Sequence, residues 1–262
     1  MILVTGSTDG IGKETALGLL RKGARVLLHG RDAARLESTR SEFAAAGFAA
    51  AGTIIGDFTR FESVRAMAAE LREKYEDLNV LVNNVGVYMK KRVETPDKNE
   101  MTWQVNYLAP ALLTLELMPL LEKNTPSRII NVSSIAHTRG GIDFFNLHAQ
   151  LGFDSYAAYA QSKLANVLFT YELASQLSGK GVDVNCLHPG VIGTKLLMDG
   201  FGLDGASVEE GARTSIRLAI SEDLAGVSGK YFVKEQPTPS SPMSYDTALR
   251  KKLWLETIQS IS

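Results

Sequence analysis

The sequence is poor in cysteine. Cys186 is the single cysteine among 262 residues, so the chain has no pair with which to form an internal disulfide. Secreted proteins of this size more often carry several cysteines, whereas a reducing cytoplasm keeps thiols free. We therefore predict a cytoplasmic protein whose stability comes from a packed core.

The chain also lacks a long apolar run. No stretch approaches the roughly 18 to 20 consecutive apolar residues that a membrane-spanning helix needs. The sequence begins directly on the apolar residues that we expect to form its first strand, which leaves no space for a signal peptide. We therefore expect no integral membrane segment.

Neither sign of charge is in excess. The chain has 28 Lys and Arg against 29 Asp and Glu, for a formal net charge of -1. This balance supplies no long-range attraction toward nucleic acid or an anionic membrane, so we expect small-molecule partners and no nucleic acid. The 4 histidines are scattered without metal-ligand spacing, and we predict no metal site.

What the sequence has instead is a regular alternation of short apolar runs and longer helical patterns. This order is typical of βαβ units and a parallel sheet. Most runs lack polar–apolar alternation, as expected when helices cover both faces of the sheet. We predict a single α/β domain, 1–262, with a doubly wound, Rossmann-type parallel sheet of about seven strands and helices on both faces. The expected strands are 2–5, 25–29, 52–55, 80–83, 128–133, 182–187 and 230–233, and the expected helices are 12–22, 33–46, 61–75, 100–121, 156–177 and 208–219.

Three prolines interrupt this pattern near the C-terminus. Pro237, Pro239 and Pro242 predict an extended loop, followed by a short helix near 247–258. We treat 235–262 as a C-terminal extension of the domain.

A glycine-rich turn follows the first expected strand and leads into a helix. Glycines let the main chain approach a pyrophosphate, whose charge is met by the N–H groups and the positive dipole end of the helix. A glycine turn is also a common way for α/β proteins to change direction, so spacing alone leaves dinucleotide binding open. The residues expected to contact a cofactor here are Gly6, Ser7, Thr8, Asp9, Gly10, Ile11 and Gly12.

The end of the second expected strand bears on the choice between NAD and NADP. An NAD site usually has a carboxylate there for the ribose 2′-OH, whereas Arg31 suits the 2′-phosphate of NADP. Asp32 also lies at about the right distance, but its place before helix 33–46 favours an N-cap. We therefore favour NADP(H), with NAD(H) possible. After the third strand, Asp57 and Phe58 are candidate adenine contacts, and a capping role for Asp57 is equally compatible.

Tyr159 and Lys163 lie four residues apart, on one face of an expected helix. Such pairs arise by chance, but this one accompanies Ser134 after a strand and Asn106 within a helix. Lowering a phenol pKa from about 10 to about 7 requires roughly 4 kcal/mol of phenolate stabilisation. A nearby ammonium and the positive ring of an oxidised nicotinamide would supply it, which makes Tyr159 a candidate proton donor and acceptor.

Pro110 bears on Asn106. Because proline has no N–H, an α-helix would leave the Asn106 carbonyl without its usual partner. The freed carbonyl is equally compatible with a water ligand in a proton relay and with a simple helix kink.

Together these residues resemble the short-chain dehydrogenase/reductase family. The matching motifs, in family order, are Thr5-Gly6-x-x-x-Gly10-Ile11-Gly12, Asn83-Asn84-Val85-Gly86, Asn106, Ser134, Tyr159-x-x-x-Lys163 and His188-Pro189-Gly190. Segments 131–137, 162–166, 187–190 and 229–232 resemble, more narrowly, its retinol dehydrogenase-like branch. The resemblance implies hydride transfer between a nicotinamide C4 and a carbonyl or alcohol carbon.

The resemblance also implies residue roles. Tyr159 exchanges the proton with the substrate oxygen, and Ser134, preferred to Ser133, hydrogen-bonds that oxygen. Lys163 binds the ribose hydroxyls and biases Tyr159 toward phenolate, while Asn106 anchors a water relay. The further cofactor contacts implied are Asn84, Gly86, Pro189, Gly190, Val191 and Thr194.

The substrate is expected beneath the loop region 189–210, because ligands of open α/β sheets bind outside the carboxyl ends of the strands. Its apolar residues Leu196, Leu197, Met198 and Phe201 would form a mobile lid over a lipophilic substrate, or a surface helix packed on the core. A segment longer than the family usually has, between Ser134 and Tyr159, makes a monomer or homodimer the expectation rather than a tetramer.

We therefore predict an NADP(H)-dependent oxidoreductase acting on a small lipophilic carbonyl or alcohol. The alternative is a catalytically silent NADP(H)-sensing binding protein. The complete set of Asn106, Ser134, Tyr159 and Lys163 speaks against that alternative.

Overall fold

The computed structural model describes residues 1–202 and 204–262, and its centre is one eight-stranded sheet. The strand order is β3-β2-β1-β4-β5-β6-β7-β8, and all neighbours are parallel except β7 and β8. The predicted doubly wound sheet is confirmed. The strands are β1 (Ile2–Val4), β2 (Val26–Gly30), β3 (Gly52–Ile55), β4 (Val80–Asn83), β5 (Ser127–Val132), β6 (Val182–His188), β7 (Tyr231–Val233) and β8 (Gln236–Pro237).

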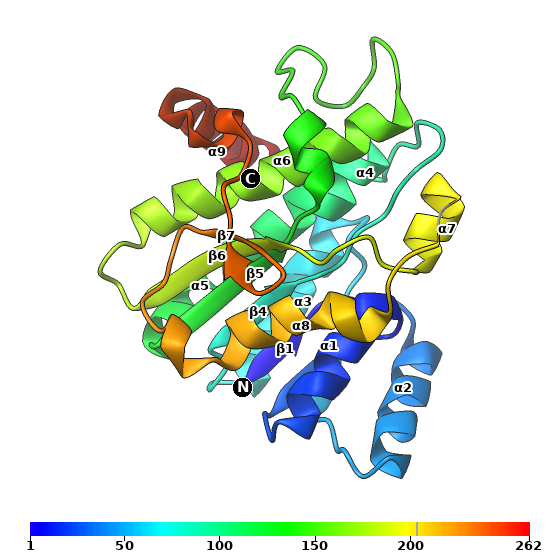
Figure 1. The fold of residues 1–262 in the computed structure, drawn as a ribbon, viewed down its shortest axis with the longest axis vertical. Coiled ribbons are helices and arrows are strands. Elements are labelled where there is room, and N and C mark those ends of the chain that lie inside the picture. Colours follow the sequence, from blue (N-terminus) through cyan, green and yellow to red (C-terminus); the bar gives the residue numbers. More distant parts are fainter. Residues whose placement is uncertain (203) are drawn as a thin grey trace.

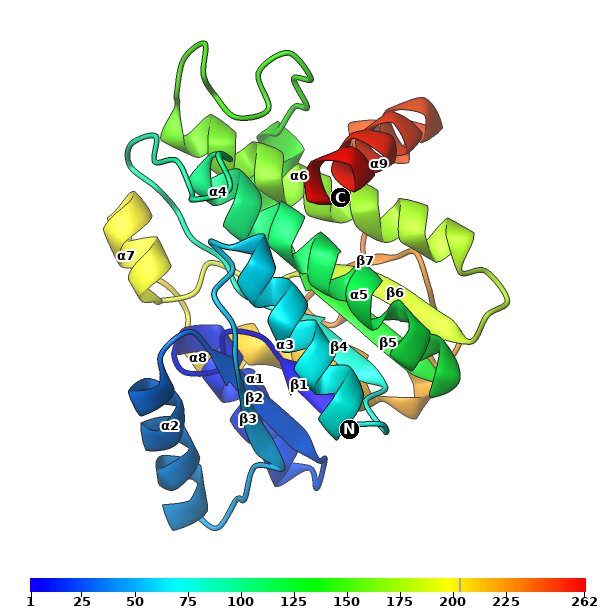
Figure 2. The ribbon, with the colours of Figure 1, turned by 180° about the vertical axis from the view of Figure 1, so that it is seen from behind.

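Helices cover both faces of this sheet. Figure 1 shows α1 and α8 in front of the strands, and Figure 2, from behind, shows α3 and α5 on the opposite face. No helix within 1–202 and 204–262 combines the length and apolar character needed to cross a bilayer. The helices are α1 (Gly10–Arg21), α2 (Ala33–Ala45), α3 (Phe61–Lys74), α4 (Met101–Trp103), α5 (Ala109–Lys123), α6 (Ser155–Gln176), α7 (Lys195–Phe201), α8 (Val208–Ile220) and α9 (Thr247–Ile261).

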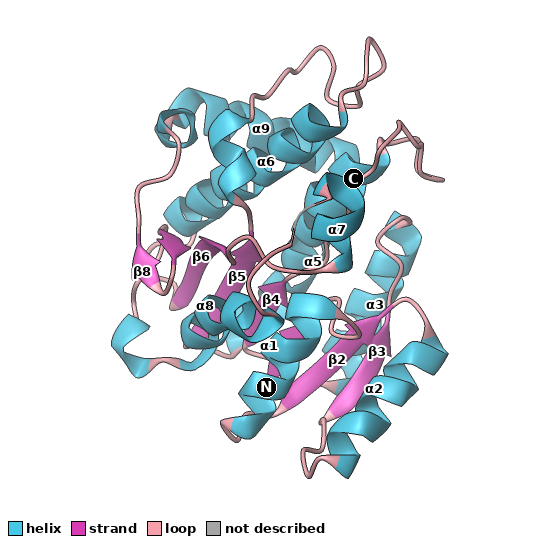
Figure 3. Ribbon diagram, turned by 45° about the vertical axis from the view of Figure 1, so that its right-hand side comes forward, coloured by secondary structure: helices cyan, strands magenta, loops and turns pink. Residues whose placement is uncertain are grey.

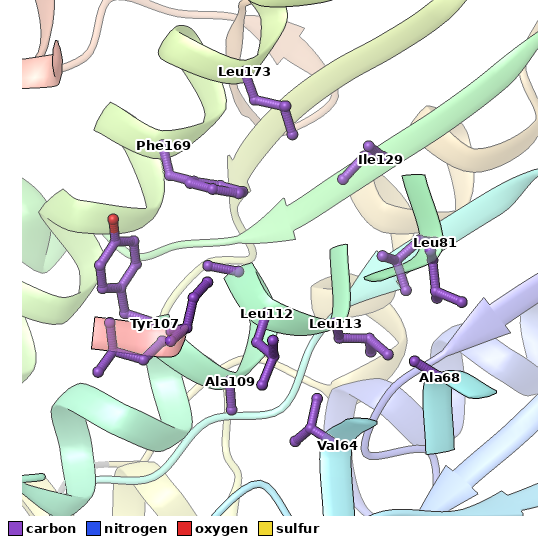
Figure 4. Close-up of a cluster of buried hydrophobic side chains, with 14 of the residues drawn as sticks. Val64, Ala68, Leu81, Tyr107, Ala109, Leu112, Leu113, Ile129, Phe169 and Leu173 are labelled. Atoms are coloured by element: carbon purple, nitrogen blue, oxygen red, sulfur yellow. The ribbon is translucent and has the colours of Figure 1, made fainter. Parts of the chain in front are cut away.

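The central strands β1 and β4 are almost entirely apolar because both of their faces are buried. Ile2 and Val4 pack with α1, α2 and α8, whereas Leu3 points to the other face and packs with α3, α5 and α6. Figure 4 shows the second cluster, with Val64 and Ala68 of α3 facing Leu113 of α5. Burying a leucine-sized side chain contributes roughly 1.5 to 3 kcal/mol, so these two layers stabilise the sheet between its helices.

The site is positioned by the point where the strand order reverses. The chain runs from β1 to β2 and β3 on one side, then crosses to β4 on the other side of β1. Connections leaving β1 and β4 therefore diverge, which opens a crevice at their carboxyl ends. Figure 3 shows α7 lying over this end of the sheet.

The expected continuous helix 100–121 is wrong in its middle. After α4 the chain forms a π-helical segment, Gln104–Leu108, before α5 begins. The N–H of Ala109 bonds the carbonyl of Gln104, five residues earlier, so the register around Asn106 is not α-helical. Pro110 stands in the first turn of α5, where its missing N–H costs little. The expectation that Pro110 frees the Asn106 carbonyl assumed an α-helical register, and a free carbonyl at Asn106 stays a prediction.

The C-terminal residues are more regular than expected. Gln236 and Pro237 add the short antiparallel strand β8, which the prolines concealed, and Pro242–Tyr245 forms a 3-10 turn. Helix α9 extends to Ile261 and packs beside α6, where the Trp254 ring stacks on Phe169 at 5.5 Å (Figure 1). Residues 235–262 are therefore an integrated part of the fold.

Candidate functional site

A cavity of about 780 Å³ opens at the carboxyl ends of the central strands. It has the size of a small-molecule site and gathers residues from the phosphate loop, the loops after β4, β5 and β6, and helices α6 and α7. In the part of the chain that the structure describes, no group of three acidic, histidine or cysteine side chains is arranged to hold a metal ion. The predicted site residues that line the cavity are Gly6, Asp9, Gly10, Ile11, Gly12, Asn84, Gly86, Ser134, Tyr159, Lys163, Pro189, Gly190, Val191 and Thr194.

The glycine-rich turn after β1 depends on its glycines. Gly6 and Gly10 have φ values of +66° and +53°, which L side chains rarely adopt. A Cβ on Gly12 would lie 2.3 Å from the Gly6 carbonyl oxygen and from Asn84 Nδ2. The close approach leaves the start of α1 open to a ligand, as a pyrophosphate requires.

His29 supports this turn from beneath. Its Nδ1 accepts a hydrogen bond from the Gly6 N–H at 2.9 Å, and its Nε2 lies 3.1 Å from the Gly56 carbonyl oxygen. These partners require the neutral tautomer with the proton on Nε2, and burial lowers the pKa of His29 to about 4. This role of His29 was not predicted, although a histidine inside an apolar strand was the available signal.

The neighbouring residues of the turn face different ways. Ser7 is fully buried, and its hydroxyl accepts from the His29 N–H at 2.8 Å, so its side chain supports the turn from inside. Thr8 packs against the end of β2, where a Cβ on Gly30 would lie 2.9 Å from its methyl group.

The end of β2 carries the residues that bear on cofactor choice. Arg31 is exposed and makes no ion pair with any described residue. Asp32 accepts from the Arg35 N–H at 2.8 Å and caps α2, as predicted. Arg35 in turn reaches back to Asp9 of the phosphate loop, at 3.1 Å. The carboxylate that would have argued for NAD is therefore engaged in capping a helix.

Asp57 and Phe58 have structural partners. The Asp57 carboxylate accepts from the N–H and hydroxyl of Thr59 at 3.0 and 2.9 Å, which shapes the turn before α3. The Phe58 ring is buried and lies 5.1 Å from the His29 ring. A cofactor would therefore meet Phe58 only through its main chain.

The loop after β4 is tied to the phosphate loop. Asn84 Nδ2 donates to the Thr5 carbonyl at 2.9 Å, and the Asn84 N–H donates to the Thr5 hydroxyl at 2.9 Å. A Cβ on Gly86 would lie 3.5 Å from Lys163 Nζ and 3.6 Å from Asn106 Oδ1. Gly86 therefore lets these two polar side chains approach the loop.

The Asn106 side chain is a clamp. Its Oδ1 accepts from the Val87 N–H at 2.7 Å, and its Nδ2 donates to the Val87 carbonyl and to the Ser162 hydroxyl at 2.9 and 3.1 Å. These bonds join the β4 loop to α6 in a fully buried position. The water relay implied by the family resemblance stays a prediction.

The hydroxyls of the two serines after β5, Ser133 and Ser134, make different hydrogen bonds. The Ser133 hydroxyl is buried and donates to the Lys163 carbonyl at 2.7 Å, which fixes α6 against the strand end. The half-buried Ser134 hydroxyl instead accepts from the Ala136 N–H at 3.2 Å and is hydrogen-bonded to Tyr159. Ser134 is thus the serine that the geometry couples to the phenol.

Burial shifts the pKa values of Tyr159 and Lys163 in opposite directions. Burial raises the pKa of Tyr159 to about 12, against the lowering effect of the Ser134 hydroxyl. Burial lowers the pKa of Lys163 to about 8; its ammonium donates to the Val132 carbonyl at 2.9 Å and lies 5.6 Å from the Tyr159 ring centre. The predicted lowering of the phenol pKa by the ammonium and an oxidised nicotinamide together stays a prediction.

Apolar and aromatic side chains surround Tyr159. Tyr88, Tyr156 and Leu196 pack against Tyr159 and Ala136, and the Tyr88 ring centre lies 5.5 Å from that of Tyr159. Tyr88 was not predicted. Leu196 and Leu197 line the cavity from the short helix α7, whereas Met198 is 52% exposed. The Phe201 side chain and residue 203, part of the predicted lid region, lie outside the described residues.

The sequence matches known proteins along its whole length. The profile of the short chain dehydrogenase family matches residues 1–201. The chain is 39% identical to human retinol dehydrogenase 13, covering 99% of this chain and 84% of that protein. It is also 39% identical to mouse retinol dehydrogenase 14, with coverage of 97% and 83%.

Solved structures share the fold. An uncharacterised protein from Mycobacterium paratuberculosis superposes with a TM-score of 0.82 at 28% identity, covering 99% of this chain and 92% of that one. Pseudomonas aeruginosa RhlG, solved as an active-site complex with NADP, superposes with a TM-score of 0.71 at 28% identity, covering 88% and 93%.

Proposed function

Because the chain belongs to the short-chain dehydrogenase family, in its retinol dehydrogenase-like branch, we propose that this oxidoreductase uses NADP(H) and acts on a small lipophilic carbonyl or alcohol. The observation that carries the proposal is the meeting of Ser134, Tyr159 and Lys163 at one cavity wall. A hydroxyl, a phenol and an ammonium at that wall are the groups that carbonyl reduction needs.

The residues present fit a dinucleotide. Gly10, Ile11 and Gly12 at the start of α1 line the cavity, so N–H groups of this first turn would hold the pyrophosphate. Lys163 lies beside Gly86 and would donate to the ribose hydroxyls. Exposed Arg31 would bind a 2′-phosphate in a bidentate fork. When bound, the nicotinamide would supply or accept the hydride.

Ser134 and Tyr159 would handle the substrate oxygen. The Ser134 hydroxyl would donate a hydrogen bond to that oxygen and hold it beside the phenol. At neutral pH the raised pKa keeps Tyr159 protonated, so the phenol can give its proton to the oxygen of a carbonyl being reduced. A protonated phenol is the form that carbonyl reduction requires.

The walls of the cavity support a lipophilic substrate. Tyr88, Tyr156 and Leu196 surround the phenol and offer apolar surface in place of charge. A substrate with an apolar body and one carbonyl or hydroxyl group would place that group at Ser134 and Tyr159.

Turnover separates an enzyme from a cofactor-sensing protein. We expect NADPH oxidation with some aldehydes, ketones or quinones, and we expect Tyr159→Phe to abolish it while leaving the NADPH Kd unchanged. Tyr156→Phe, on the same helix and at the same cavity, is the matched control and should keep most activity. Wild-type turnover by Tyr159→Phe would overturn the proposal. NADPH binding without turnover of any carbonyl by the wild type would favour the binding protein.

Cofactor choice has its own test. Arg31→Ala should raise the NADPH Kd about 10- to 100-fold, because a charge-assisted hydrogen bond contributes roughly 1.5 to 3 kcal/mol. The NADH Kd should change little. Arg40→Ala removes another exposed arginine, one paired with Glu37 on α2, and should affect neither. Equal losses for both cofactors would contradict the preference for NADP.

A further inference from the structure

His137 lies in the turn that follows Ser134, and it is 1% exposed. Its Nδ1 is 2.7 Å from the Ser134 main-chain carbonyl oxygen, and its Nε2 is 3.1 Å from the Ser241 nitrogen. The Ser241 N–H can only donate, so Nε2 accepts and the ring proton lies on Nδ1. His137 is therefore a neutral imidazole that donates to Ser134 and accepts from Ser241.

The surroundings of His137 favour this neutral form. Its ring lies 4.7 Å from the ring of Tyr231 on β7, and burial lowers its pKa. Protonation of the ring to its cation would put a hydrogen on Nε2. That atom could then no longer accept the hydrogen bond from the Ser241 N–H. We call the two hydrogen bonds of His137, to Ser134 and from Ser241, the His137 bridge. Both exist together only when the ring is neutral and its proton is on Nδ1.

The segment 240–244, which His137 contacts through Nε2, is held by further hydrogen bonds. Tyr171 of α6 is hydrogen-bonded to the Ser240 hydroxyl at 2.7 Å, and Ser240 to the Ser244 hydroxyl at 2.6 Å. The segment 240–244 is thereby fastened to α6, the helix that carries Tyr159 and Lys163. His137 connects this fastened segment to the main chain of the serine that faces the phenol.

The Nδ1 atom of His137 holds the main-chain carbonyl of Ser134. Ser134 has extended backbone, φ −158° and ψ 158°, and its carbonyl direction sets the orientation of its peptide plane. The His137 N–H also reaches this carbonyl, at 3.1 Å, so the same residue holds it through main chain and side chain. Rotation of this plane would move the Ser134 hydroxyl away from the oxygen that it is to hold.

We propose that His137 is a positioning residue for Ser134, acting through the hydrogen bond between its Nδ1 and the Ser134 main-chain carbonyl. The inference rests on the proposed function, in which Ser134 holds the substrate oxygen. A displacement near 1 Å at a reacting group can cost about 100-fold in rate, so loss of the Nδ1 hydrogen bond should be visible in kcat.

Two amide variants of His137 test its hydrogen bonds to Ser134 and from Ser241 separately. His137→Asn places an amide N–H near the Nδ1 position and keeps a donor for the Ser134 carbonyl. His137→Gln places its amide near the Nε2 position, keeping an acceptor for Ser241 and losing that donor. We expect His137→Gln to lower kcat about 10- to 100-fold with an unchanged NADPH Kd, and His137→Asn to retain most of kcat. Equal kcat values for the two variants would overturn the proposal.

A double-mutant cycle tests whether His137 acts through Ser134. In the Ser134→Ala background, adding His137→Gln should cause little further loss of kcat, because the group being positioned is already gone. Full additivity would indicate a general structural role and contradict the proposal. Ser244→Ala is the matched control: it removes a hydrogen bond from the same segment and should lower Tm without the loss of kcat.

The same kcat values distinguish failure of the proposed function from failure of the positioning role of His137. Wild-type kcat in Ser134→Ala would overturn the proposed function. A slow Ser134→Ala together with a fully active His137→Gln would leave the proposed function standing and overturn the positioning role.

Discussion

Asp9 and Lys195 form an ion pair at 3.1 Å that connects the phosphate loop to α7. The same carboxylate pairs with Arg35 of α2 at 3.1 Å and accepts from the Gly10 N–H at 2.9 Å. An acidic side chain thus joins two cationic residues at the edge of a site proposed for an anionic cofactor. The Asp9 carboxylate connects the phosphate loop to α2 and α7, and it also adds negative charge where the cofactor phosphate would bind.

Asp9→Asn should tighten NADPH binding. The variant removes the negative charge and frees Arg35 and Lys195, while asparagine remains a good helix cap. We expect the NADPH Kd to fall about 2- to 5-fold in low salt, since exposed pairs are worth up to ~1 kcal/mol, and the gain to shrink in high salt. Fluorescence titration at two ionic strengths measures it. Asp223→Asn, remote from the cavity, is the control, and a weaker Kd in Asp9→Asn would contradict this prediction.

His29 should make the fold sensitive to acid. Its pKa is about 4 in the folded chain, against a reference of 6.5, so the unfolded chain binds more protons between these values. Its stabilisation is complete above pH 6.5 and is lost as pH falls toward 4, by roughly 3 kcal/mol at most. Tm measured from pH 7.5 to 4.5 should therefore fall. His29→Asn, which can still accept from the Gly6 N–H, should show a flatter profile; the same slope as wild type would contradict the assignment.

Gly12→Ala should damage the cofactor site. The added methyl would meet the Gly6 carbonyl at 2.3 Å, so the loop or α1 must move. Overpacking of this kind costs roughly 1 to 3 kcal/mol, and we expect a lower Tm with an NADPH Kd raised at least about 10-fold. Gly141→Ala is the control, because a Cβ there meets no atom within 4 Å. Equal NADPH binding by both variants would show that the cradle tolerates a side chain.

Thr257→Val should measure how firmly α9 is docked. The Thr257 hydroxyl is hydrogen-bonded to the buried Tyr107 hydroxyl in the π-helical segment. The substitution leaves that phenol without its partner, at a cost of about 1 to 3 kcal/mol in the free energy of unfolding. Urea unfolding measures the loss, and the exposed Ser260→Ala should stay within roughly 0.5 kcal/mol of wild type. A change in Thr257→Val no larger than in Ser260→Ala would count against this contact.

Local patterns were enough for much of the fold and for the outline of the site. Apolar runs such as 80–83 predicted the strands, because a strand buried on both faces is mostly apolar. Asp32 was recognised as a cap because a cap bonds its own helix within a few residues. The meeting of Ser134 with Tyr159 and Lys163 was expected as an implication of the family resemblance.

Contacts between distant residues were not predictable in this way. Ser241 and His137 are 104 residues apart, and Tyr107 and Thr257 are 150 apart. The proline-rich composition predicted an extended loop where the structure adds strand β8, and it contained no information on where α9 would dock. The π-helical segment around Asn106 was also not predicted, and a continuous helix was expected there.

The amino-acid sequence alone determined the sheet, the glycine turn and the identity of the groups available for chemistry, because each depends on residue type and on neighbours along the chain. Only the tertiary structure decided which histidines stay neutral and how the C-terminal residues reach the turn that follows Ser134. Those outcomes depend on burial and hydrogen bonding between remote segments, and such interactions exist only once the chain has folded.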